Sequence, residues 1–174
     1  ELSSKVDFSI NLFIGLSLFW FFADILSRAP SLITSVPNYV KKVIFPLEIL
    51  PVIPILSGLF HLFINITIIM IALIITKGEL HLSIVALPII IISTFPLLLG
   101  AGLLLGSIGV YARDITAVIG VILNMLMFLS PIFYPLSAIP KNMQWLFELN
   151  PLTLIIETTR AAFMQGTWPD WSSM

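Results

Sequence analysis

Two long stretches without a formal charge limit what this chain can fold into. Residues 49–76 form one such stretch of 28 residues, and residues 80–112 form another of 33. Roughly 20 mostly apolar residues in a helix cross the hydrocarbon core of a bilayer, so each stretch is long enough to span a membrane. Only 10% of the residues are charged and 59% are hydrophobic, whereas about 25% of residues are charged in soluble domains. The sequence therefore predicts an all-α integral membrane protein.

Four spanning helices are expected in a single transmembrane domain that covers residues 1–174. Charged and polar boundaries place them at about residues 8–27, 49–76, 88–110 and 115–134. Residues 80–112 exceed the length of one span. Because proline lacks the N–H that continues a helix, Pro88 and Pro96 predict a division of this stretch into a lead-in and the third span.

The region 131–164 is expected to form re-entrant half-helices that enter the membrane and return on the same side. Four prolines interrupt its first part: Pro131, Pro135, Pro140 and Pro151. Non-helical backbone at membrane depth is tolerated only where protein or a water-filled cavity covers it. Glu157 and Arg160 lie three residues apart in the last helical piece, which predicts a weakly stabilising pair on one face.

A polar bridge, residues 28–48, separates the first two predicted spans. Pro37 and Pro46 frame the sequence NYVKKVIF, which is long enough for two turns of helix and too short to span. We interpret it as a short helix on the membrane surface, where a partner protein could push on the spans. The residues expected to make that contact are Ser35, Asn38, Tyr39, Lys41 and Lys42.

One face of the first span mixes aromatic, hydroxyl and carboxylate side chains. Its members follow the spacing i, i+4, i+7, i+11 and are Phe13, Ser17, Trp20 and Asp24. We name these four residues the stripe. A carboxylate facing lipid costs about 2.5–3.5 kcal/mol at the helix centre, so the stripe is expected to line a substrate path. The alternative is that Asp24 pairs with Arg28 at the membrane surface and Trp20 is an interfacial anchor.

Other polar and small residues give weaker signals. His61 and Asn65, four residues apart in the second span, suit either a metal or proton-relay site or two interhelical hydrogen bonds, and we favour the hydrogen bonds. Gly102 and Gly106 form a GxxxG pair that predicts close helix packing. The chain has no cysteine and no HExxH, GxSxG or Walker-A sequence, so catalysis and nucleotide binding have no local signature. The net charge of −1 argues against nucleic acid as a partner.

The short polar turn Arg113-Asp114 separates the third and fourth predicted spans. Asp114 directly precedes the fourth span. A carboxylate at this position can cap the first turn and interacts favourably with the positive end of the helix. We therefore expect Asp114 to cap the fourth span.

Five sequence motifs, in order, resemble the permease subunit of ABC-2-type polysaccharide exporters. They are GLSLFWFFADIL, NYVKKVIFPLEILP, GVYARDI, MFLSPIFYP and LNPLT. The likeness is greatest to the O-antigen/lipopolysaccharide export family, with teichoic acid export permeases close behind. Each motif alone is weakly specific, but the five together extend over nearly the whole chain.

The resemblance implies a six-span subunit, of which this chain would hold the second to fifth spans. One span and an amphipathic helix would precede Glu1, and a last span would follow Met174. The subunit would form a homodimer around a channel and pair with a separate ATP-binding subunit. The pair would export lipid-linked polysaccharide across the plasma (inner) membrane. No cofactor is expected in this chain, because ATP and Mg would bind to the partner.

The same resemblance places residues 28–48 in the cytoplasm, where Ser35, Asn38, Tyr39, Lys41 and Lys42 would belong to a coupling helix docked on the ATP-binding subunit. Arg113 and Asp114 would form a second cytoplasmic turn, and residues 131–164 would lie on the outer side.

Three other functions stay open. A teichoic acid or capsular polysaccharide exporter permease fits the same motifs. A membrane-embedded lipid-processing enzyme would need acid, base or metal-binding residues that converge at one depth. A channel or assembly subunit would work without ATP, and co-purification with an ATPase separates the exporter from the last two.

Overall fold

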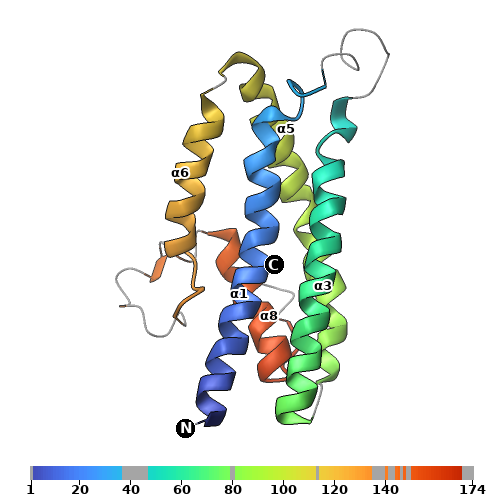
Figure 1. Cartoon of the computed structure of the whole chain (residues 1–174), viewed down its shortest axis with the longest axis vertical. Coiled ribbons are helices and arrows are strands. Elements are labelled where there is room, and N and C mark those ends of the chain that lie inside the picture. The colour runs from blue at the N-terminus through green and yellow to red at the C-terminus, as the bar shows by residue number, and fades with distance from the viewer. Residues whose placement is uncertain are drawn as a thin grey trace. The chain divides into compact units, whose positions relative to one another are not determined.

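The computed structural model describes residues 2–36, 47–78, 81–112, 114–134, 140, 144–145, 147 and 150–169. These residues are mostly helical, and none of them lies in a strand (Figure 1). The α-helices are α1 (Leu2–Arg28), α3 (Val52–Lys77), α4 (Leu87–Ser93), α5 (Phe95–Tyr111), α6 (Ile115–Phe128) and α8 (Pro151–Met164). In the same described residues, short 3₁₀ helices accompany them: η1 (Ala29–Ser31), η2 (Leu47–Ile49) and η3 (Leu82–Ala86). The predicted all-α fold class is confirmed.

Within the described residues, three helical runs are long and apolar enough to cross a membrane. They are Lys5–Ser31, Val52–Lys77 and Leu82–Tyr111, of 27, 26 and 30 residues. They correspond to the first three predicted spans. The third run is interrupted at Thr94, between α4 and α5, so Pro88 and Pro96 each lie in the first turn of a helix. Proline is tolerated there because the first N–H groups of a helix have no internal partner.

The fourth predicted span forms a shorter helix than expected. Its helix α6 has 14 residues and ends at Phe128, not at Tyr134. At 1.5 Å per residue it is about 21 Å long, against roughly 30 Å of hydrocarbon. Pro131 accounts for the early end, since proline cannot donate to the preceding turn and disfavours helix in the residue before it. A crossing by residues 115–134 therefore stays a prediction.

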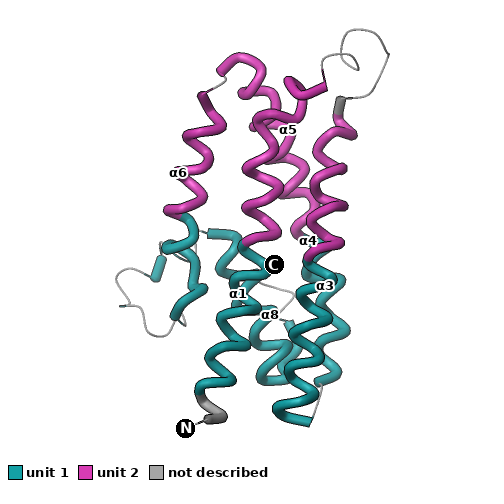
Figure 2. Tube along the Cα trace, in the orientation of Figure 1, with its two compact units in different colours: residues 1–19, 62–93, 126–174 teal, residues 20–61, 94–125 magenta. Residues whose placement is uncertain are grey.

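The chain divides into two compact units (Figure 2). Unit 1 consists of residues 1–19, 62–93 and 126–174, and unit 2 consists of residues 20–61 and 94–125. Three of the boundaries cut through α1, α3 and α6, and the fourth lies at Thr94, between α4 and α5. Helices α1, α3 and α6 therefore each contribute one end to each unit.

The core of unit 1 is built around α8. Ile156, Ala162 and Phe163 of this helix are almost fully buried, as are Ile14 of α1 and Ile69 of α3. Helix α8 packs against η3 and α4. The hydroxyl of Ser83, in η3, donates a buried hydrogen bond of 2.7 Å to the carbonyl oxygen of Ala162.

The core of unit 2 joins α1, α3 and α5. Ile25 of α1 and Ile55 of α3 are fully buried, and Leu98 of α5 is nearly so. Gly58 of α3 lies close to the ring of Phe21, because a Cβ added to Gly58 would come within 3.0 Å of that ring. The absence of a side chain at Gly58 lets α1 and α3 approach closely.

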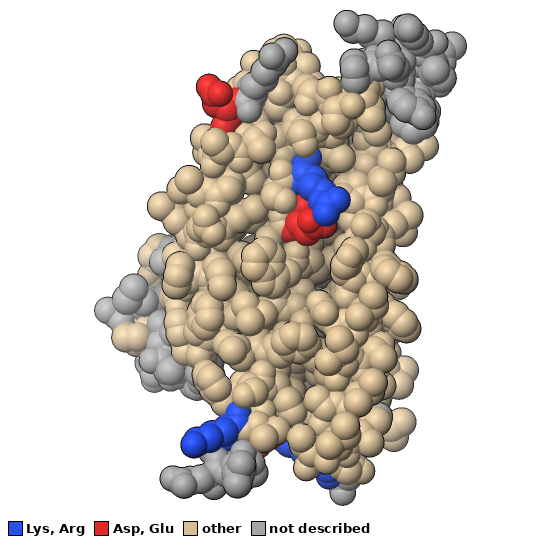
Figure 3. Space-filling model, in the orientation of Figure 1, with Lys and Arg blue, Asp and Glu red and all other residues tan. Residues whose placement is uncertain are grey.

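The surface is predominantly apolar. On the face drawn in Figure 3, charged side chains occupy only a few places among a large uncharged area. Helix α3 is especially exposed, with Phe63 and Ile75 at 69% and 78% exposure. Exposed apolar side chains along a helix of this length are typical of a surface that faces lipid.

Candidate functional site

Arg160 of α8 is the central polar residue of unit 1. Its Nε and Nη2 both donate to the carbonyl oxygen of Asn11 at 3.1 Å, and Nη2 also donates to the carbonyl oxygen of Ile132 at 2.7 Å. Its Nη1 donates to the carbonyl oxygen of Pro131 and lies 3.6 Å from Oε1 of Glu157. One guanidinium therefore joins α1, the turn at 131–132 and α8.

Arg160 stays positively charged because the ordinary pKa of a guanidinium is very high. Burial lowers the pKa of the guanidinium, and the nearby carboxylate of Glu157 opposes that shift. Arginine is not deprotonated in proteins, so the group stays a cation. A half-buried cation needs several acceptors, and here three carbonyl oxygens supply them.

Gly15 makes room for this guanidinium. A Cβ at Gly15 would lie 2.9 Å from Nη2 of Arg160 and 3.4 Å from Cα of Ile132. Helix α1 thus presents an open surface at Gly15, one turn after the carbonyl of Asn11. The side chain of Asn11 donates to the carbonyl oxygen of Asp7 at 3.0 Å and so stays along its own helix.

A second polar link joins the turn after α6 to the start of α8. Asn150 is the N-cap of α8, since its side-chain oxygen accepts from the backbone N–H of Leu152 at 3.0 Å. Its side-chain nitrogen donates to the hydroxyl of Ser130 at 3.0 Å, and both side chains are buried. The motifs MFLSPIFYP and LNPLT therefore meet through Ser130 and Asn150.

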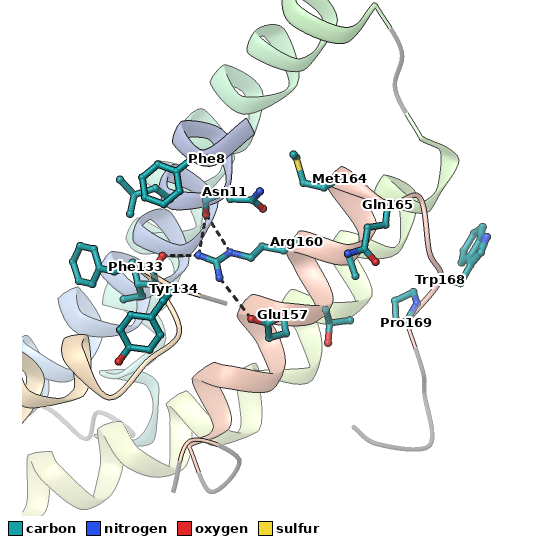
Figure 4. A pocket seen from close by; sticks show the side chains of 14 residues that line it. Phe8, Asn11, Phe133, Tyr134, Glu157, Arg160, Met164, Gln165, Trp168 and Pro169 are labelled. Atoms are coloured by element: carbon teal, nitrogen blue, oxygen red, sulfur yellow. Dashed lines mark hydrogen bonds and ion pairs between the residues drawn. The ribbon is translucent and has the colours of Figure 1, made fainter. Parts of the chain in front are cut away.

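A pocket of roughly 580 Å³ opens beside Arg160, within unit 1. In Figure 4 the side chains of Phe8, Phe133 and Tyr134 lie on one side of the guanidinium, and Trp168 lies on the other. Glu157, from α8, also lines the pocket. The pocket combines aromatic rings with a few polar groups, which is the usual composition of small-molecule sites.

Unit 2 contains a contrasting site, in which the backbone near the bridge packs on three buried glycines of α5. A Cβ at Gly102 would lie 2.9 Å from the ring of Pro51, and one at Gly106 would lie 3.4 Å from the carbonyl oxygen of Ala29. A Cβ at Gly109 would overlap the carbonyl group of Pro30. We name these three residues the glycine stripe. It contacts the chain on both sides of residues 37–46.

Comparison with known proteins identifies the family. The profile of the ABC-2 type transporter family matches residues 2–164. The chain belongs to the ABC-2 type transporter family. The resemblance in its five motifs is thereby confirmed, and its apolar helices belong to a membrane protein.

Relatives of this ABC-2 chain include two bacterial proteins named O-antigen export system permease protein RfbA. The one from Klebsiella pneumoniae is 26% identical over 164 residues, which is 92% of this chain and 62% of the relative. The one from Myxococcus xanthus is 24% identical over 167 residues, or 94% of this chain and 64% of the relative. The chain thus spans less than two thirds of the length of these relatives.

Of the predicted coupling residues of the ABC-2 chain, the structure describes one. Ser35 lies in a turn after η1, where its hydroxyl donates to the carbonyl oxygen of Leu32 at 3.1 Å. The other four lie outside the described residues and stay predictions: Asn38, Tyr39, Lys41 and Lys42.

The second predicted cytoplasmic turn is described only at Asp114, because Arg113 lies outside the described residues. Asp114 is exposed, and its backbone carbonyl oxygen accepts from the N–H of Ala117 at 3.0 Å. A cap by its side chain stays a prediction.

The stripe on α1 is not uniform in its surroundings. Phe13 and Trp20 are 39% and 60% exposed, whereas Ser17 is buried and its hydroxyl has no hydrogen-bond partner among the residues that the structure describes. Asp24 pairs with Arg28 at 2.9 Å, which is the alternative that the sequence offered. The role of the stripe as a substrate path stays a prediction.

The polar residues of the second predicted span lie along the helix surface. His61 is exposed, and its Nδ1 lies 2.9 Å from the carbonyl oxygen of Ser57 within α3. Among the described residues, no three His, Cys, Asp or Glu side chains are grouped closely enough to hold a metal ion.

The sequence pointed only weakly to Arg160. The Glu157–Arg160 contact was predicted and forms, but the carbonyl oxygens of α1 and the 131–132 turn provide most of the guanidinium's partners. The lone cation of a helix that is mostly buried is the signal that could have identified it. The Asn-Pro pair at 150–151 was likewise readable as an N-cap followed by proline in the first turn.

Proposed function

We propose that this chain is part of the permease subunit of an ATP-driven exporter of lipid-linked polysaccharide in the plasma membrane. Two copies would enclose the channel, and a separate ATP-binding subunit would hydrolyse ATP with Mg. The observation that carries this proposal is the family match over residues 2–164, together with relatives named as O-antigen export permeases. By this analogy the substrate is an O-antigen-type glycan.

The packing of unit 2 supports a route for mechanical coupling. The bridge 28–48 begins at η1 and is followed by Pro51, and both flanks rest on the glycine stripe of α5. A partner that pushes on the bridge would therefore act on α1, α3 and α5 together. Tight backbone packing transmits such a displacement because it cannot be compressed.

The test is export in cells whose own permease gene is deleted. Tyr39→Ala combined with Lys42→Ala is expected to lower glycan export severalfold and to reduce co-purification of the ATP-binding subunit, while the permease stays in the membrane. Lys5→Ala, an exposed basic residue at the other end of α1, is the control and should export normally. Normal export in the double variant contradicts the coupling assignment. If the deletion strain exports its glycan normally, the proposed function fails.

A further inference from the structure

The geometry points to a binding site for one neutral sugar unit of the glycan in the pocket beside Arg160. This inference rests on the proposed function, because it names where the exported polysaccharide contacts unit 1. It concerns residues outside the stripe on α1.

The aromatic lining suits the apolar faces of a sugar ring. Phe8, Phe133 and Trp168 line the pocket while remaining 59%, 36% and 63% exposed. Figure 4 shows Phe8 and Phe133 on one side of Arg160 and Trp168 on the other. The C–H faces of a pyranose ring pack on such rings, and large aromatic side chains supply much contact area at low conformational cost.

The polar lining suits hydroxyl groups. The side chain of Glu157 is 38% exposed and lines the pocket, while its Oε1 lies 3.6 Å from Nη1 of Arg160. A carboxylate accepts hydrogen bonds from hydroxyl groups, and hydrogen bonds to a charged group are among the stronger ones. Gln165, at the end of α8, lines the same pocket and can both donate and accept.

The charge of the pocket favours a neutral ligand over a phosphate. Arg160 directs four hydrogen bonds to three backbone carbonyls and places Nη1 near Glu157, so its N–H groups are already occupied. The carboxylate of Glu157 would repel an anion. Arg160 is therefore a positioning residue that fixes α8 and Glu157, and it does not bind the ligand itself.

The size and openness of the site agree with transient contact. A volume of roughly 580 Å³ lies in the range of small-molecule sites. A polysaccharide that moves through an exporter needs sites that bind each sugar unit well enough to admit it and weakly enough to release it. Half-exposed rings beside one partly exposed carboxylate meet that need.

Photo-cross-linking in cells that synthesise the natural glycan tests the inference. A photoreactive phenylalanine analogue is placed at Trp168 or at Phe133 of the complete exporter, and the purified permease is stained for attached polysaccharide after illumination. A polysaccharide ladder is expected at both positions. Phe63 of α3, 69% exposed and outside the pocket lining, is the matched control and should give none.

Variants of Glu157 sharpen the result. Glu157→Ala is expected to lower the cross-linking yield at Trp168 by about two- to tenfold. This is the effect expected from the loss of about one hydrogen bond. Glu157→Gln keeps an acceptor oxygen and should lower the yield less. Unchanged membrane levels and ATPase co-purification show that both variants fold.

Three results would overturn the inference. One is a yield at Trp168 no higher than at Phe63, and another is a ladder that persists when glycan synthesis is blocked. The third is a ladder with the analogue at Trp20 but none at the pocket, which leaves the proposed function standing. If no position, including Trp20, gives a ladder and deletion of the permease leaves export normal, the proposed function falls as well.

Discussion

The packing inside unit 1 and the packing inside unit 2 depend on different kinds of contact. In unit 1 a cation on α8 donates to carbonyl oxygens of α1 and the 131–132 turn, so the joint is polar and directional. In unit 2 the backbone at Ala29 and Pro30 lies directly on glycines of α5, so the joint depends on the absence of side chains. A hydrogen-bonded joint loses stability in steps as donors are removed. A steric joint fails at the first added methyl group, because the interior is closely packed.

The largest effect is expected from Gly109→Ala in unit 2. The added Cβ would overlap the carbonyl group of Pro30, so the backbone must shift, at a cost of about 3 kcal/mol or more. The thermal midpoint of the purified protein in detergent measures this. Gly100→Ala, in the same helix with no atom within 4 Å of the new Cβ, should leave the midpoint unchanged or raise it. Equal midpoints for the two variants would show that unit 2 is not held by steric contact.

Arg160→Leu should come next. It leaves the carbonyl oxygens of Pro131 and Ile132 without the guanidinium, and the free energy of unfolding should fall by about 2–4 kcal/mol. Arg160→Lys should recover only part of the loss, because an ammonium group lacks the planar set of five donors. A full recovery with lysine would mean that charge, and not the geometry of the donors, holds unit 1.

Asn150→Ala should have a smaller effect. Loss of an N-cap side chain costs about 1 kcal/mol, and the hydroxyl of Ser130 also loses its donor. Asn150→Asp keeps an oxygen that can accept from Leu152, so its thermal midpoint should lie nearer the wild type. The reverse order of the two variants would indicate that burying a carboxylate at position 150 costs more than the cap contributes.

The smallest effect is expected at the surface of unit 1. Asp7 and Lys77 form a partly exposed ion pair at 3.0 Å, and such pairs contribute about 0–1 kcal/mol. Asp7→Asn should therefore change the thermal midpoint much less than Arg160→Leu. An equal loss would contradict the view that the half-buried cation contributes more to unit 1 than a surface ion pair does.

The sequence by itself determined the class of the protein and its principal elements. Apolar length and scarce charge predicted a helical membrane protein, and three of the four expected spans have helices of spanning length. The five motifs predicted the family. These features follow from local composition and spacing, which a bilayer constrains strongly.

Only the tertiary structure decided how individual residues are used. The GxxxG pair predicted close packing, but not that its partners would be the Pro51 ring and the Ala29 carbonyl, on the two sides of the bridge. The sequence predicted only a weak pair between Arg160 and Glu157. The main hydrogen-bond acceptors of Arg160 instead lie 149, 29 and 28 residues away in the chain. The reason is physical, because backbone carbonyls are present at every position and carry no sequence signal. Which of them faces a given side chain is settled only when the helices pack.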